Sequence, residues 1–110
     1  VMKKTNLDNC GTLPDFGNFC IADVWGDDGC NEWYDMYKGV SELMPYAKAV
    51  SAKTYDFDDD GNETKIDYAK MINIVKQNNY KGFIGVEYEG SRLSEKDGIL
   101  ATKNLIQRFI

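Results

Sequence analysis

Short apolar runs along the chain alternate with helical patterns. The clearest run is at residues 83–86 and leads directly into Glu87, Glu89 and a glycine. A strand of a parallel sheet has this layout when its C-terminal end carries polar side chains toward a site. Residues 49–55 form a second, less apolar candidate strand, and residues 12–19 read as a short strand end followed by a loop.

Three stretches carry the apolar spacing of amphipathic helices. The first is predicted at residues 33–48, after a loop at 26–29, with Pro45 disturbing its last turn. The second opens at the capping pattern of residues 64–67, and the third at that of residues 94–97. The apolar faces predicted for them, in this order, are Met36, Val40, Leu43, Met44 and Ala47; Tyr68, Met71, Ile72 and Val75; and Ile99, Thr102, Ile106 and Phe109.

The order of these elements predicts a single α/β domain over residues 1–110. Residues 1–6 resemble the tail of a helix, and no linker or low-complexity run interrupts the pattern that follows. Asp15, Lys53 and Glu87 are spaced about 35 residues apart, which fits consecutive βαβ units of thirty-odd residues. We therefore expect three consecutive βα units with parallel strands, and these three side chains at the same end of neighbouring strands.

Charge and composition exclude several classes of function. The net charge is −5, and 13 basic residues are scattered among 18 acidic ones, which argues against nucleic acid and anionic membranes as partners. No long apolar segment predicts a membrane span. The chain has no histidine, so a Ser-His-Asp or Cys-His mechanism within it is excluded. Cys10, Cys20 and Cys30 are odd in number and lack C-x-x-C spacing, which favours buried free thiols in a reducing compartment.

The polar residues at the predicted strand ends are the candidate site: Asp15, Asn18, Lys53, Glu87 and Glu89. Carboxylates from different strand ends can hold a hard cation such as Mg²⁺ or Mn²⁺, and a nearby lysine can stabilise an oxyanion or a phosphate. The alternative is that these are solvated loop residues. Spacing alone does not decide between the two.

Two other patterns have structural explanations. Residues 56–61 match the opening of an EF-hand loop, but a strand precedes them where an entering helix is required, so a tight acidic turn is favoured over a Ca²⁺ site. Aromatic side chains near strand ends can form the floor of a sugar site. Core positions are favoured for Trp33, Tyr34 and Tyr37, whereas Trp25, Tyr55 and Tyr88 are open to either role.

Four blocks of sequence, at residues 11–19, 37–45, 50–58 and 85–90, resemble the C-terminal part of bacterial sugar phosphate isomerases/epimerases. These belong to the xylose-isomerase-like superfamily of TIM barrels. The resemblance implies that the chain is a C-terminal fragment of such a barrel, with the last three of its βα units, because a full barrel needs about 250 residues.

The resemblance also implies roles for individual residues. Asp15 and Glu87 match two ligands of the divalent metal (Mn, Mg or Co) of metal-dependent relatives, and Glu87 is also the implied catalytic base. Lys53 stands where a metal-binding histidine is expected, so it either replaces the cation in stabilising an enediolate oxygen or marks the loss of isomerase chemistry. Asn18 stands at a substrate-contacting position, and Glu89 is its neighbour in the proposed substrate site.

The function implied is that of a sugar (or sugar phosphate) isomerase or epimerase, which transfers a proton next to a carbonyl. The fragment itself is expected to be inactive alone, to self-associate through its exposed edge strands, and to come from a cytoplasmic protein. The alternative is a carbohydrate-binding or assembly module that has lost its metal site.

Overall fold

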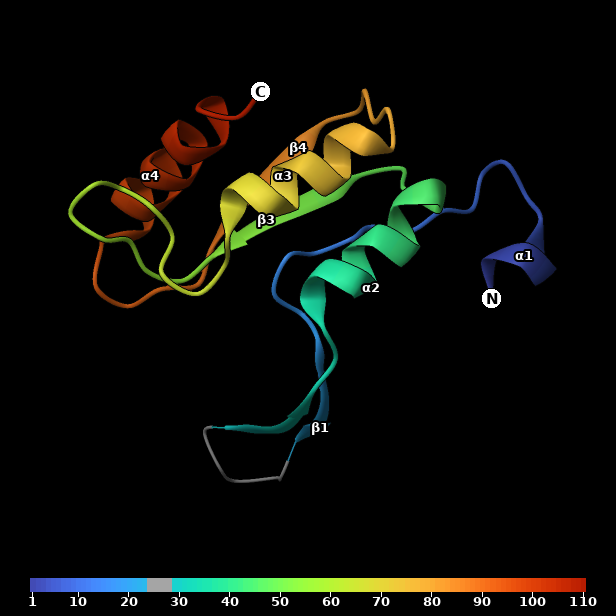
Figure 1. The fold of residues 1–110 in the computed structure, drawn as a ribbon, viewed down its shortest axis with the longest axis horizontal. Helices are drawn as coiled ribbons and strands as arrows, with labels where there is room; N and C mark the ends of the chain where they lie inside the picture. Colours follow the sequence, from blue (N-terminus) through green and yellow to red (C-terminus); the bar gives the residue numbers. More distant parts are fainter. Residues whose placement is uncertain (24–28) are drawn as a thin grey trace.

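The computed structural model describes residues 1–23 and 29–110, which form four α-helices and two small sheets (Figure 1). Trp25 and most of the loop predicted at residues 26–29 lie outside the described residues. The helices are α1 (Met2–Thr5), α2 (Met36–Leu43), α3 (Tyr68–Gln77) and α4 (Glu95–Gln107), with a 3₁₀ turn η1 (Met44–Tyr46) after α2. The strands are β1 (Cys20–Asp23), β2 (Cys30–Trp33), β3 (Val50–Thr54) and β4 (Ile84–Tyr88).

The strand topology contradicts the predicted partial TIM barrel. β1 and β2 pair antiparallel with each other, and only β3 and β4 pair in parallel. The segment before β1 does not form a strand. It makes two isolated parallel bridges, from Thr12 to Ala47 just before β3 and from Asp15 to Ser51 in β3. Pro14 lies between these bridges and has no N–H to donate, which limits the ladder there. The prediction of three consecutive parallel βα units is therefore wrong.

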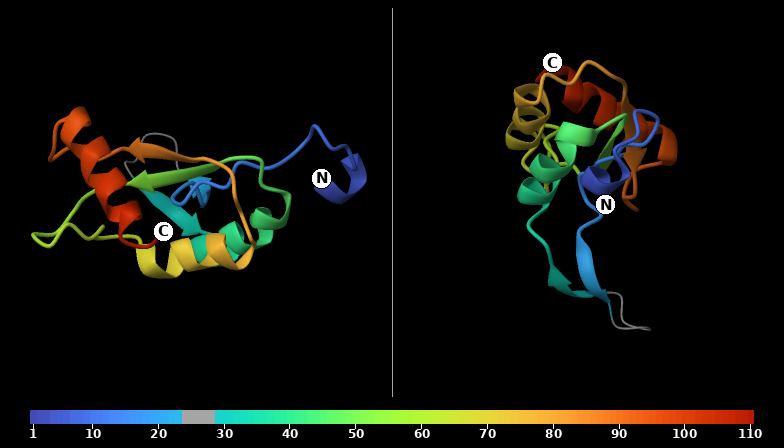
Figure 2. Two further views of the ribbon diagram at one scale, coloured as in Figure 1. Left: turned by 90° about the horizontal axis from the view of Figure 1, so that it is seen from above. Right: turned by 90° about the vertical axis from the view of Figure 1, so that its right-hand side faces the viewer.

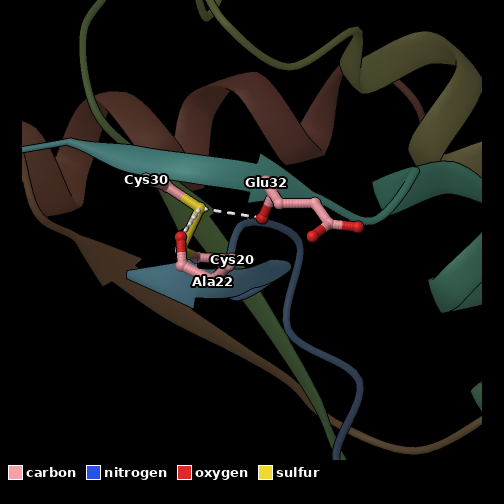
Figure 3. The surroundings of a disulfide bond; sticks show 4 residues. All are labelled: Cys20, Ala22, Cys30 and Glu32. Atoms are coloured by element: carbon pink, nitrogen blue, oxygen red, sulfur yellow. Dashed lines mark hydrogen bonds between the residues drawn. A yellow bond between two sulfur atoms is a disulfide. The ribbon is translucent and has the colours of Figure 1, made fainter. Parts of the chain in front are cut away.

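The chain between the first bridged segment and α2 folds into a hairpin that the sequence pattern did not predict. This hairpin, β1 and β2, extends away from the helices in Figure 1 and in the right view of Figure 2. A disulfide joins Cys20 to Cys30 across it, as Figure 3 shows, whereas Cys10 is a free, half-buried thiol. The expectation of three free thiols is thus wrong for two of them. Sequence spacing could not show this because the pairing depends on the antiparallel register of the two strands.

Helix starts follow their capping residues. Asp35, Asp67 and Ser94 each accept a hydrogen bond from the backbone N–H three residues later, at about 3.0–3.1 Å. Asp67, and not the predicted Thr64, therefore opens α3. Pro45 lies inside η1, where the predicted first helix tightens into a 3₁₀ turn instead of continuing to residue 48.

Alternation along β3 separates the core from the candidate site. Val50, Ala52 and Thr54 are buried, and the Thr54 hydroxyl lies 2.6 Å from that of Thr102 in α4. Ser51 and Lys53 point to the opposite face of the strand, because successive side chains alternate. The core on the helix side consists of Val40, Met44, Val50, Ala52, Met71, Ile72, Val75, Leu105 and Ile106, with Phe16, Phe57, Ile66 and Tyr68 completing it.

Three apolar residues expected inside are exposed. Phe83 is 92% exposed because β4 begins only at Ile84. Trp33 is 56% exposed because it is the last residue of β2, in the hairpin that projects from the rest of the fold. Ile99 in α4 is also largely exposed, since the buried face of that helix runs through Gly98, Thr102, Leu105 and Ile106. The face predicted for α3 is buried throughout and is confirmed.

Candidate functional site

Strand pairing brings the candidate residues together. In the parallel register of β3 and β4, Lys53 lies opposite Glu87. The bridge between Asp15 and Ser51 is held by two backbone bonds, from the Phe16 N–H to the Ser51 carbonyl and from the Ser51 N–H to the Pro14 carbonyl. Three segments that are distant in sequence therefore present their polar side chains on one face of β3.

Lys53 is the centre of this group. Its side chain is 2% exposed, and its ammonium lies 2.7 Å from the Asn18 amide oxygen. Carboxylate oxygens of Glu89, Glu87 and Asp15 lie 3.0, 3.4 and 3.8 Å from the same nitrogen. The ammonium donates a hydrogen bond to Asn18 and forms ion pairs with the three carboxylates. We call Lys53, Asp15, Asn18, Glu87 and Glu89 the Lys53 cluster.

The charges around Lys53 keep it protonated. Burial by itself lowers the pKa of a lysine, but the hydrogen bond to Glu89 and the charges of Asp15 and Glu87 outweigh it, so the pKa of Lys53 is raised above 10.5. The group is therefore a fixed positive charge at neutral pH. A neutral lysine acting as a base is not available in this arrangement.

Glu87 is held in its ionised form by a neighbour on β3. The Ser51 hydroxyl donates to Glu87 at 2.7 Å, and this bond, together with the Lys53 charge, lowers the pKa of Glu87 below its ordinary 4.5 despite partial burial. The side chain is 42% exposed, so it remains accessible to a ligand. Ser51 was missed from the sequence, although its position two residues before Lys53 in a strand places both on one face.

A prediction follows for the titration of Glu87. The Ser51→Ala variant is expected to raise the pKa of Glu87 toward 4.5, because the largest cause of its depression is removed. In the wild-type chain the ionised carboxylate stabilises the fold above pH 4.5, and this contribution is lost as the pH falls through the lower folded value. Carbon-detected NMR of the Glu87 carboxyl, recorded from about pH 2 to about pH 7 so that the range lies on both sides of the ordinary pKa, measures the shift. An unchanged pKa in Ser51→Ala would contradict this interpretation; Ser41→Ala, on exposed α2, is the control.

Asp15 has one satisfied and one unsatisfied oxygen. Its Oδ1 accepts from the backbone N–H groups of Gly17 and Asn18, both at 2.9 Å, which fixes the turn after it. Its Oδ2 is buried and has no hydrogen-bond partner among the described residues. Gly17 is required at this turn because a Cβ there would collide with the Tyr55 hydroxyl and the Lys53 side chain.

The predicted metal set does not fit a divalent cation in this arrangement. The Lys53 ammonium lies between the carboxylates of Asp15 and Glu87, in the place that a cation bound by both would need. Within residues 1–23 and 29–110, no group of three or more His, Cys, Asp or Glu side chains is placed to hold a metal ion. The divalent metal stays a prediction from the resemblance in sequence.

The loop after β3 has a structural role that the sequence showed only in part. Asp58 accepts from the backbone N–H groups of Asp60 and Asn62, and Gly61 has a left-handed backbone, so the segment is a tight acidic turn as favoured. Glu63, which is buried, was missed. Its carboxylate accepts from the backbone N–H groups of Tyr55, Asp56, Lys65 and Ile66.

A small pocket lies beside the Lys53 cluster. It has a volume of about 250 Å³ and is lined by Tyr55, Asp56, Thr64, Lys65, Glu89, Gly90, Ser91 and Arg92. Glu89 belongs to both the pocket and the cluster. Tyr55, for which the sequence left open a core position or a place near the site, lines one wall of the pocket. A larger cavity of about 400 Å³ lies elsewhere, between α3, α4 and β4, and is mostly apolar.

Comparisons with known proteins add one similarity. No protein-family profile matches the chain. The chain is similar to the C-glycoside deglycosidase alpha subunit of Arthrobacter globiformis, with 34% identity over 85 residues that make up 72% of this chain and 22% of that subunit. The chain thus spans less than a quarter of the length of this relative, and the similarity does not assign it to a family. No helix in the described parts of the chain is long and apolar enough to cross a membrane.

Proposed function

We propose that the chain contributes to a carbohydrate-processing protein whose reaction transfers a proton at a carbon next to a sugar carbonyl. The observation that carries the proposal is the buried Lys53 ammonium surrounded by three carboxylates. A positive charge fixed beside carboxylate bases is what such a reaction needs, because negative charge develops on the carbonyl oxygen as the proton leaves carbon. The similarity to a protein named for acting on C-glycosides supports a sugar as the substrate.

Three members of the Lys53 cluster have roles in this reaction. Glu87 takes the proton from carbon, and the electron pair moves onto the carbonyl oxygen, which faces Lys53. Return of the proton to the neighbouring carbon gives an isomer, provided that the hydroxyl proton of the enediolate also moves to the former carbonyl oxygen. Return to the opposite face of the same carbon gives an epimer and needs a second proton donor on that face. The substrate oxygen replaces the Asn18 amide oxygen at the Lys53 ammonium. Asn18 is exposed, and it is the uncharged partner of Lys53, so it is displaced more readily than a carboxylate.

A non-catalytic carbohydrate-binding module is the second candidate. The surroundings of Lys53 favour it, because an ammonium with four oxygen neighbours is also a stable structural centre. The two candidates differ in one measurable property, since only the enzyme exchanges carbon-bound hydrogen with solvent.

Deuterium incorporation tests the proposal. The carbohydrate-processing protein that contains this chain is expected to catalyse exchange of the hydrogen next to the carbonyl of a ketose in D₂O. Proton NMR of D-fructose, D-tagatose and D-xylulose measures the exchange. Glu87→Gln is expected to lower the rate by about 100-fold or more, the usual contribution of a general base. Glu95→Gln, a matched change on the exposed start of α4, should leave it unchanged. Binding of a ketose without exchange would favour the second candidate and contradict the enzyme.

A further inference from the structure

The unpartnered oxygen of Asp15 points to a ligand with hydroxyl groups. Asp15 is 9% exposed, and its Oδ2 makes no hydrogen bond within the described structure. A buried carboxylate oxygen without a partner costs free energy that a donor from outside can recover. The oxygen accepts and does not donate, so the missing partner is an O–H or N–H group. Approach is from the side of Glu87 and Glu89, which are 42% and 49% exposed, because Lys53 and Asp15 are buried.

The balance of charge around the site disfavours an anionic ligand. The Lys53 cluster holds three carboxylates and one ammonium. In the adjoining pocket, Arg92 is bound to Asp56 at 2.7 Å and to the Phe57 carbonyl, and the Lys65 ammonium lies over the Tyr55 ring. The buried Glu63 adds a further negative charge behind Tyr55. Each cation facing the site is thus already engaged, and the carboxylates outnumber the cations.

The backbone donors beside Asp15 are also taken. The N–H groups of Gly17 and Asn18, which follow Asp15 in the turn, both donate to its Oδ1. A phosphate is normally bound by free backbone N–H groups, lysines or arginines. At Asp15 the site therefore offers an acceptor where a phosphate needs donors.

We propose that the site takes a neutral sugar, with one hydroxyl donating to Asp15 Oδ2 and another to Glu89, and that it excludes the phosphorylated form. This inference rests on the proposed function for the identity of the ligand as a sugar. It changes the substrate class, because the resemblance in sequence left sugars and sugar phosphates equally open. The pocket of about 250 Å³ beside Glu89 holds the part of the sugar that faces away from the cluster.

Paired titrations test the ligand class. The full chain is titrated by heteronuclear NMR with D-fructose, D-tagatose and D-xylulose, and with the matching fructose 6-phosphate, tagatose 6-phosphate and xylulose 5-phosphate. At least one neutral sugar is expected to shift the Asp15, Gly17 and Glu89 signals, and to bind about tenfold or more tightly than its phosphate. A phosphate that binds as tightly as its neutral partner, or the absence of neutral binding in the whole set, would overturn the inference.

Two variants separate the contacts. Asp15→Asn keeps an oxygen for the Gly17 and Asn18 N–H groups but turns Oδ2 into a donor, so neutral-sugar affinity should fall by about tenfold. Glu89→Gln, on a half-exposed side chain that tolerates change, should improve the affinity for the phosphate relative to the neutral sugar by removing a negative charge. Asp97→Asn on exposed α4 is the control. An unchanged preference in Glu89→Gln would contradict the charge argument.

The preference for a neutral sugar and the proposed reaction can fail independently of each other. Neutral-sugar binding without deuterium exchange leaves the ligand class in place and removes the reaction. Exchange with a sugar phosphate as the better ligand retains the reaction and overturns the ligand class.

Discussion

Replacing Lys53 with methionine is expected to lower the free energy of unfolding by about 3 kcal/mol, the lower end of the range for breaking a buried ion pair. Methionine keeps the length and apolar contacts of the side chain but removes the charge. Asp15 then remains buried with no counter-charge, whereas Glu87 and Glu89 are half exposed and recover part of their hydration. Urea denaturation at pH 7 measures the change.

The matched controls for this variant isolate charge from packing. Lys96→Met on the exposed face of α4 should change stability little. Adding Asp15→Asn to Lys53→Met should recover part of the loss, because the buried charge left without a partner is then also removed. A loss below about 1 kcal/mol, or no recovery in the double variant, would show that the ammonium is solvated and that the cluster is not a buried charge centre.

The Glu63→Ala variant is the second large effect expected, at about 3 kcal/mol of lost stability. One carboxylate satisfies four backbone N–H groups in the turn between β3 and α3, and alanine leaves all of them without an acceptor. The same turn carries Tyr55 and Lys65 of the pocket, so sugar binding should weaken in parallel.

A graded series makes this second prediction specific. Glu63→Gln retains one acceptor oxygen and loses the other, so its thermal and urea midpoints should lie between those of the wild type and of Glu63→Ala. Asp59→Ala, on an exposed residue of the same turn, is the control. If Gln and Ala cost the same, or if Asp59→Ala costs as much, the carboxylate of Glu63 does not hold the turn.

Local pattern predicted individual elements better than their assembly. The β3 and β4 strands, the buried face of α3 and the Ser94 cap all follow from apolar spacing and capping chemistry, which act over a few residues. The hairpin was not predicted because β1 and β2 are short and their sequence carries no alternating apolar pattern, and the disulfide across them follows only from their register. The third parallel strand was predicted where the structure has only bridges around Pro14.

The Lys53 cluster was predicted as a set but its organisation was not. Spacing placed Asp15, Lys53 and Glu87 at one edge, and in the structure the carboxylates of Asp15 and Glu87 lie 3.8 and 3.4 Å from the Lys53 ammonium. Side-chain conformation decides which group lies between the carboxylates, and spacing along the chain carries no information about it. A metal was therefore expected near Asp15 and Glu87, where the structure has the Lys53 ammonium. Ser51 and Glu63 act through hydrogen bonds whose partners lie in other segments, and no local pattern marks such bonds.

The most direct test of the central claim is deuterium incorporation into a neutral ketose, with EDTA present, by the carbohydrate-processing protein that contains this chain. The Lys53 ammonium supplies the positive charge beside Glu87, so the account predicts exchange that persists in EDTA and falls by about 100-fold or more in Lys53→Met that remains folded. Exchange that appears only after Mn²⁺ or Mg²⁺ is added, or that survives the loss of Lys53, would contradict it.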